Sequence, residues 1–206
     1  MPWGLTRFQQ SRQTHFVTFS CYHRHPLLNS DEIRRTFESA LERVRRCYRL
    51  YIYAYVLMPE HVHLLLSEPQ LEDDLLKPGL GYKADYDWLR RPQDCTLAGA
   101  VKSLKQGVSR RFIGDAKHFW QKRYYDFNVR THRQFEQKVR YLHNNPVKRG
   151  LCDRPEDWPW SSFRHFAAGV EGRVKIESEW TARKRERAAG TLSPAVELPH
   201  SSQNRA

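Results

Sequence analysis

Two histidines separated by one residue, His61 and His63, could hold a divalent metal ion. They open the run HVHLLLS, whose composition predicts a β-strand. Successive side chains of a strand point to opposite faces, so both imidazoles share one face, with Cα atoms roughly 6.6 Å apart. Because short motifs also arise by chance, the pair alone favours two polar residues at a strand edge. A second pair, His23 and His25, precedes Pro26 and indicates a solvated turn or a phosphate contact.

A tyrosine and an asparagine lie side by side on a helix predicted around residue 140. In this helix Phe135, Val139 and Leu142 form the apolar stripe that must face the core. Tyr141 and Asn145 lie off that stripe and one turn apart, so both can point at a neighbouring strand surface and share one site. Periodicity alone favours a tyrosine at the core margin and an asparagine that ends the helix.

Two further residues near these groups have open roles. Tyrosine has an ordinary pKa of about 10, so a nucleophilic tyrosine must lose its proton as attack begins. His143 is a candidate for the base, although its position favours a polar residue on the exposed flank of the helix. Glu60 either holds the imidazole of His61 in place or ends a turn.

The strands that must position these groups are dense in β-branched and aromatic side chains. They are predicted over residues 14–22, 50–58 and 61–67, with one or two more over 118–130. Alternating with three helices, they predict an α+β fold in which helices pack on an antiparallel, ferredoxin-like sheet. The RNA-recognition fold has a similar order of elements.

The predicted helices have start signals and basic outer faces. Asp31 can cap a helix that runs to about residue 49, and a second helix is predicted over 96–113. Thr131, three residues before Gln134, indicates a capping box for the third helix, and Pro146 limits that helix because proline disfavours helical geometry at the residue before it.

The composition points to a polyanionic partner. Lys and Arg total 35 against 23 for Asp and Glu, which gives a formal net charge of +12 and a sequence pI of about 9.8. Aromatic residues make up 13% and supply surfaces on which unpaired bases stack. No run approaches the roughly 20 apolar residues that span a bilayer. The four cysteines show no C-x-x-C spacing, so we expect them to be reduced and without a metal role.

The chain is predicted to form one domain over residues 1–168. Prolines, glycines and an acidic cluster mark 69–95 as a surface insertion, and 169–206 is predicted as a basic, flexible C-terminal tail. Trp158, Trp160 and Phe163 could stack on bases, but aromatic clusters of this kind more often dock a terminal segment on the core, which we expect here.

Several motifs in order resemble one family. The segments HFVTFSCYHRHPLL, YVLMPEHVHLLLSEP, KSLKQGVSRRF, FWQKRYYDFNV, VRYLHNNPVKRGL and DWPWSSF are similar to REP-associated tyrosine transposases, which are single-tyrosine HUH transposases of bacterial insertion sequences. The resemblance covers residues 14–168 apart from the insertion. The insertion at 69–95 and the histidine at position 25 depart from the family pattern.

The resemblance implies an HUH nuclease domain with a ferredoxin-like sheet. His61 and His63 would be metal ligands, Asn145 the third ligand and Tyr141 the nucleophile. The ion would be Mg²⁺ or Mn²⁺, and nitrogen ligands suit Mn²⁺ better. The substrate would be single-stranded DNA with hairpin-forming repeats, cleaved and rejoined through a 5′-phosphotyrosine. Without an apolar run that spans a bilayer or a secretory signal, the protein is expected to be cytoplasmic, and as a bacterial DNA-binding protein to be associated with the nucleoid. The choice between a monomer and a homodimer stays open at this point.

Basic residues on the helices and loops are predicted to contact the DNA. They are Arg34, Arg35, Lys102, Lys105, Arg110, Arg111, Arg123 and Lys148. Two alternatives stay open at this point. A non-catalytic module for single-stranded nucleic acid would bind without cleavage. A metal-dependent phosphodiesterase would turn over without a covalent intermediate.

Overall fold

The structure, a computed structural model, describes residues 13–69, 95–114 and 117–181. Its four strands form one antiparallel sheet in the order β2-β3-β1-β4. The strands are β1 (Thr14–Ser20), β2 (Ile52–Leu57), β3 (His61–Ser67) and β4 (Tyr125–Val129). With one helix between β1 and β2 and another between β3 and β4, this is the ferredoxin-like arrangement, and the predicted α+β fold is confirmed.

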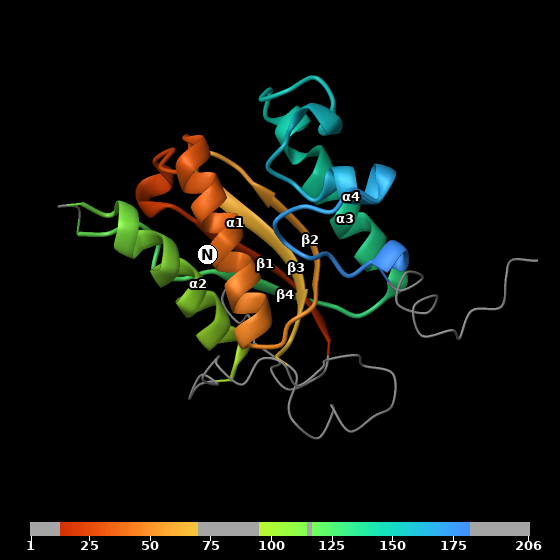
Figure 1. The fold of residues 1–206 in the computed structure, drawn as a ribbon, viewed down its shortest axis with the longest axis horizontal. Coiled ribbons are helices and arrows are strands. Elements are labelled where there is room, and N and C mark those ends of the chain that lie inside the picture. Colours follow the sequence, from red (N-terminus) through yellow and green to blue (C-terminus); the bar gives the residue numbers. More distant parts are fainter. Residues whose placement is uncertain (1–12, 70–94, 115–116, 182–206) are drawn as a thin grey trace, which may run out of the picture.

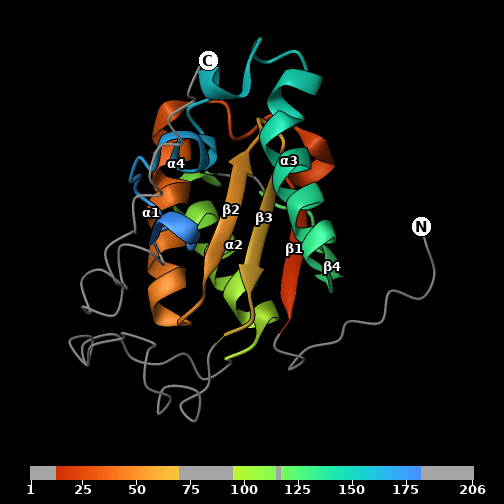
Figure 2. The same ribbon diagram turned by 90° about the vertical axis from the view of Figure 1, so that its right-hand side faces the viewer.

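The helices cover both faces of the sheet. They are α1 (Asp31–Cys47), α2 (Leu97–Phe112), α3 (His132–Lys148) and α4 (Phe163–Ala168), with short 3₁₀ turns η1 (Tyr22–Arg24) and η3 (Pro155–Asp157). Figure 1 shows α1 and α2 on one face and α3 on the other, and Figure 2 shows α3 in front of the sheet, running along the strands beside β3 and β1. Strand alternation explains the two layers, because Val17 and Phe19 pack under α1 and α2 while Phe16 packs under α3.

Two predicted helix starts are confirmed and one is wrong by a residue. The Thr96 hydroxyl accepts a hydrogen bond from the backbone N–H of Gly99, and that of Thr131 accepts one from Gln134. The first helix is capped by Ser30 rather than by Asp31. Asp31 is the first helical residue, where its negative charge still interacts favourably with the helix N-terminus.

Pro146 does not end α3, which continues through it to Lys148. Proline lacks one backbone N–H, and near the end of a helix that loss removes a single hydrogen bond without breaking the last turn. The chain leaves the helix at Gly150, whose φ of 66° suits glycine. Of the range 118–130, residues Tyr125–Val129 form a strand, and Trp120 makes only an isolated bridge to Cys21.

The segment after α3 returns over the edge strand β2. The indole N–H of Trp158 donates to the Leu57 carbonyl at 3.0 Å, and Trp160 packs against the core, which confirms the expected docking of these rings. Further along, Val174 and Ile176 are buried and Ile176 bridges to Ile52, so these two residues of the predicted tail pack against the edge of the sheet.

The predicted domain boundary at residue 168 stays a prediction. Residues 70–94 of the predicted insertion and 182–206 of the tail lie outside the described residues. None of the helices in the described ranges is long and apolar enough to cross a membrane.

Candidate active site

The two histidines of β3 face α3, as their spacing predicts. Val62 and Leu64 point into the core under α1 and α2, whereas His61 and His63 point to the opposite face. Both imidazoles are buried, and their Nε2 atoms lie 3.0 Å apart. The polar face of β3 is therefore closed from solvent and directs two ring nitrogens to one point.

Neighbouring residues fix the orientation of His63. Thr18 of β1 lies opposite His63 in the strand pairing, and its Oγ1 is 2.7 Å from Nδ1. The amide Nδ2 of Asn145 donates a hydrogen bond of 2.8 Å to Nε2 of the same ring. Because Nε2 accepts this bond, the ring proton lies on Nδ1, where it is donated to Thr18.

Glu60 holds His61 from the other side. Its Oε1 lies 3.1 Å from Nδ1 of His61, although the angle is poor for a hydrogen bond. The same oxygen accepts hydrogen bonds from Arg149 at 2.8 Å and from Arg24 at 3.4 Å. Since Arg149 follows α3 directly, Glu60 ties the end of that helix to the start of β3. Of the two predicted roles, these contacts favour the one that positions His61.

The third helix brings the predicted tyrosine to the histidines. Leu142 is fully buried beneath α3, with Phe135 and Val139 packed against the same cluster, which confirms the predicted apolar stripe. This packing places the Tyr141 ring centroid 5.4 Å from that of His63. Tyr141 itself is 43% exposed, so its hydroxyl is accessible to a large substrate. The two predicted clusters thus meet within one chain.

Electrostatics keep the two imidazoles neutral. Burial lowers the pKa of His63 to about 3, and the neighbouring His61, when protonated, and the Lys138 ammonium act in the same direction. Burial also lowers the pKa of His61, although the Glu60 carboxylate acts against it. A neutral imidazole retains a ring nitrogen with a free electron pair, which is the form that binds metals.

The donor set fits a divalent ion. Two nitrogens that each lie about 2.1 Å from one ion at a right angle are about 3.0 Å apart, which matches the separation of the two Nε2 atoms. A half-turn of the Asn145 amide would place its oxygen where the nitrogen now faces His63. Within the described ranges no group of three His, Cys, Asp or Glu side chains could hold a metal, so a carboxamide is the third donor available here.

Lys148 is the one residue of the predicted DNA-binding set that lies beside Tyr141, with its ammonium 5.8 Å from the tyrosine ring centroid. Arg35, Lys102, Lys105, Arg110 and Arg111 lie on α1 and α2, on the other face of the sheet. Arg123 is exposed in the loop before β4.

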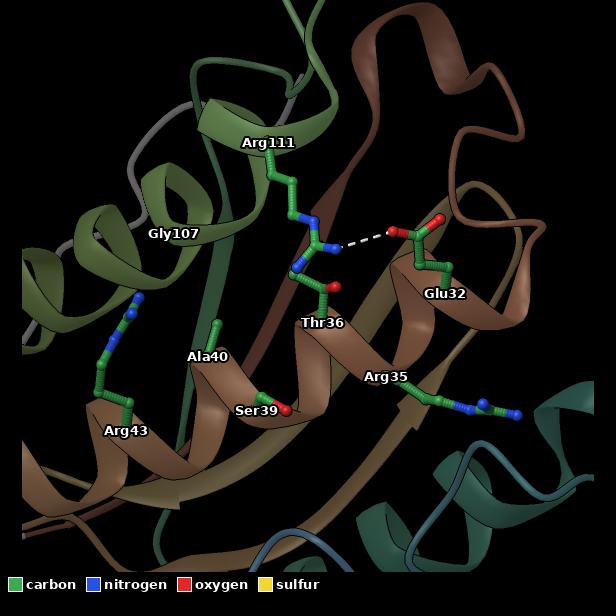
Figure 3. Close-up of a pocket in the computed structure, with 8 residues that line it drawn as sticks. All are labelled: Glu32, Arg35, Thr36, Ser39, Ala40, Arg43, Gly107 and Arg111. Atoms are coloured by element: carbon green, nitrogen blue, oxygen red, sulfur yellow. Dashed lines mark hydrogen bonds and ion pairs between the residues drawn. The ribbon is translucent and has the colours of Figure 1, made fainter.

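A groove between α1 and α2 contains two of these arginines. It has a volume of about 570 Å³ and is lined by Glu32, Arg35, Thr36, Ser39, Ala40, Arg43, Gly107 and Arg111. In Figure 3 Arg111 reaches from α2 to Glu32, with which it forms an ion pair of 2.9 Å, while Arg43 points toward Gly107. Arg35 lies 3.5 Å from Asp31. The groove is therefore basic, but part of its charge is already paired.

Two predicted DNA contacts are engaged inside the protein. Arg34 is buried, its Nε donates to the Leu28 carbonyl at 2.8 Å, and its guanidinium lies over the Trp158 and Trp160 rings. Lys105 donates to the backbone carbonyl of Gln121 at 2.6 Å.

His143 is not on an exposed flank, as its position in the helix suggested. It is buried between the rings of Phe163 and Phe166, and its Nε2 lies 2.8 Å from the Ser162 hydroxyl. Burial lowers its pKa to about 4. The returning segment after α3 covers this side of the helix, which local periodicity could not indicate.

His23 and His25 lie exposed around η1, as expected for a solvated turn.

Sequence reasoning missed three residues at the site. Phe16 stacks on His63 with ring centroids 5.4 Å apart, Thr18 bonds the same ring, and Arg149 holds Glu60. The alternation of β1 places Phe16 and Thr18 on one face, and this signal was present in the sequence. The pairing of β1 with β3, and the register that sets Thr18 opposite His63, could not be seen in the sequence.

The matching relatives are transposases. The family described as "Transposase IS200 like" matches residues 9–72, which include both histidines but not Tyr141. A REP-associated tyrosine transposase of Escherichia coli K12 is 27% identical over 132 residues, covering 64% of this chain and 66% of that protein. A Haemophilus influenzae protein that is also named as a REP-associated tyrosine transposase is 27% identical over 129 residues, which cover 62% of this chain and 66% of that protein. The chain thus spans about two thirds of the length of these relatives.

The fold also has a match among solved structures. The structure of a REP-associated tyrosine transposase bound to a REP hairpin has a TM-score of 0.62 and 22% sequence identity, covering 86% of this chain and 93% of that one. At this identity the match establishes the fold. The chain is therefore similar in sequence to REP-associated tyrosine transposases, as its motifs indicated, and it has the fold of one of them, while residues 9–72 match the IS200-like transposase family.

Proposed function

We propose that this chain is a transposase that binds single-stranded DNA with hairpin-forming repeats, and that it cleaves and rejoins strands through Tyr141. The observation that carries the proposal is the convergence of Tyr141, Asn145 and the two histidines, with the tyrosine ring 5.4 Å from His63. The named relatives support the same activity and, in one solved structure, the same kind of DNA.

The residues divide the chemistry between them. His61, His63 and Asn145 would hold Mg²⁺ or Mn²⁺, which when bound withdraws charge from a phosphate oxygen. The Tyr141 oxygen attacks phosphorus and gives up its proton, and the Tyr–O–P bond forms. The bond to the 3′-oxygen breaks, and this oxygen takes up a proton as it leaves, so that no net proton is released. The product is a 5′-phosphotyrosine and a free 3′-hydroxyl. Because the phosphodiester energy is kept in the tyrosine ester, a 3′-hydroxyl can later attack it and rejoin strands.

The DNA away from the cleaved linkage would follow the basic surfaces. Lys148, whose ammonium lies 5.8 Å from the Tyr141 ring centroid, would contact phosphates next to Tyr141. Arg35, Lys102, Arg110, Arg111 and Arg123 would bind the backbone farther away, whereas the buried Arg34 is engaged within the protein. A protein that acts on chromosomal repeats would work at the bacterial nucleoid.

A covalent-capture experiment tests the proposal. Labelled single-stranded hairpin DNA is incubated with the protein and Mn²⁺ or Mg²⁺, then separated under denaturing conditions. We expect a protein–DNA adduct that requires the metal and is absent in Tyr141→Phe. Tyr51→Phe is the control, because the Tyr51 backbone pairs with Ser67 at the end of β3 far from His61, and this variant should retain the adduct.

Other outcomes identify the alternatives. Binding without cleavage in either metal indicates a non-catalytic nucleic-acid module. Cleavage with no adduct, unchanged in Tyr141→Phe, indicates a phosphodiesterase that activates water. An adduct that survives in Tyr141→Phe contradicts the assignment of the nucleophile.

A further inference from the structure

Lys138 is a cation placed beside the site that the reaction described above does not use. It lies on α3 three residues before Tyr141, so the two side chains lie on the same side of the helix. Its ammonium is 4.6 Å from the ring centroid of Phe16 and 4.6 Å from that of Phe127. In the part of the chain that the structure describes, the ammonium has no hydrogen-bond or ion-pair partner.

Of the two phenylalanine rings that contact Lys138, Phe16 also contacts the reactive groups. The Phe16 ring stacks on His63 and meets the Tyr141 ring edge-on, with centroids 5.4 and 5.9 Å apart. One ring therefore separates the ammonium from both the tyrosine and the histidine. The charge of Lys138 is among the causes that lower the pKa of His63, which agrees with this proximity.

The rings of Phe16 and Phe127 attract the Lys138 ammonium and leave its N–H groups free to donate hydrogen bonds. Cations are attracted to ring faces at this distance, and that attraction strengthens as water is excluded. Ring faces do not accept the three N–H donors as a carboxylate would, so the donors remain available to an anion. Lys148 differs, because it is exposed and its charge is solvated.

We propose that Lys138 binds a non-bridging oxygen of the phosphate that Tyr141 attacks. The inference rests on the proposed function and adds a second positive charge at the phosphorus, supplied by the helix that carries the nucleophile. In phosphoryl transfer the charge is spread over the non-bridging oxygens, and a donor already in place stabilises it without reorganisation.

The test measures the single-turnover rate of adduct formation at saturating hairpin DNA and metal. Lys138→Met keeps the apolar stem over the two rings and removes the charge. We expect its rate to fall about 100-fold, as is typical when one preorganised donor is lost. Lys138→Arg should recover most of the rate. Arg133→Gln, an exposed change near the start of α3, is the matched control and should react like the wild type.

A neutral substrate separates a phosphate contact from a packing role. The wild-type adduct first identifies the cleaved linkage, and DNA is then made with a methylphosphonate there, in each of its two diastereomers. If Lys138 binds the replaced oxygen, the ratio of wild-type to Lys138→Met rates falls toward one for one diastereomer. A structural role would leave the ratio unchanged, because stability does not depend on the substrate.

The outcomes are distinguishable. Equal rates for wild type and Lys138→Met, or the same ratio on charged and neutral linkages, overturn the role of Lys138 and leave the proposed function standing. Absence of any wild-type adduct overturns the proposed function itself. Melting temperatures are measured for every variant, and if Lys138→Met does not fold, Lys138→Gln, which also removes the charge, replaces it in the same substrate comparison.

Discussion

The buried histidines on the two faces of the sheet differ in the groups that surround their ring nitrogens. On the face under α1 and α2, His15 is fully buried, with Nδ1 2.8 Å from Asp126 and Nε2 2.9 Å from Glu68. On the face under α3, His61 and His63 are buried with their Nε2 atoms directed at one another.

The two environments change the pKa in opposite directions. Burial lowers the pKa of His15, but the hydrogen bonds and charges of Asp126 and Glu68 outweigh it and raise the pKa above its ordinary value. Burial lowers the pKa of His63 to about 3, with no carboxylate to oppose it. A histidine bonded to carboxylates at both nitrogens has no electron pair left for a metal, so His15 is structural. Partners, and not burial, distinguish the two kinds.

The largest expected effect is on stability, at His15. His15→Gln leaves two carboxylates buried without their cation, so the free energy of unfolding should fall by about 3–5 kcal/mol. The contribution of a raised pKa is complete below the unfolded value of about 6.5 and is lost as the pH rises through the folded value. Urea unfolding of both proteins should therefore show a larger gap at pH 6 than at pH 9. A gap that does not vary with pH would mean that His15 is neutral.

The second prediction compares neighbours on opposite faces of β3. His63→Ala should lower the rate of adduct formation by more than about 100-fold. Mutating a residue that only hydrogen-bonds to a metal ligand typically lowers activity 10- to 100-fold, and His63 would be a ligand itself. Leu64→Ala should cost about 2–5 kcal/mol of stability through lost core packing. Rates and urea unfolding are measured for both variants below their melting temperatures. If folded Leu64→Ala protein forms the adduct as slowly as His63→Ala does, the two faces of the sheet do not differ in function.

The smallest effect is expected in the groove between α1 and α2. Each phosphate contact contributes about 0.7–0.9 to the slope of log affinity against log salt for DNA. Arg35→Gln and Arg111→Gln should each reduce that slope by up to this amount, while the rate at saturating DNA stays constant. Salt titrations of hairpin binding measure the change. Unchanged slopes would show that the pairs with Asp31 and Glu32 occupy these arginines in the complex as well.

Local periodicity predicted most of the elements and half of the site. The period of two in β3 put His61 and His63 on one face, and the spacing of α3 put Tyr141 beside Asn145. The same reasoning failed for His143, because the segment that covers it arrives from residues 162–166. It also failed at Pro146, where the effect of a proline depends on how much helix follows it.

The sequence by itself determined which side chains share a face, since strand and helix periods follow from backbone geometry alone. Only the tertiary structure decided which faces meet. Asn145 and His63 are 82 residues apart in the chain, and their hydrogen bond exists because Leu142 anchors α3 against the sheet between β1, β2 and β3. That anchoring is set by the shapes of side chains from separate elements, which no local pattern records.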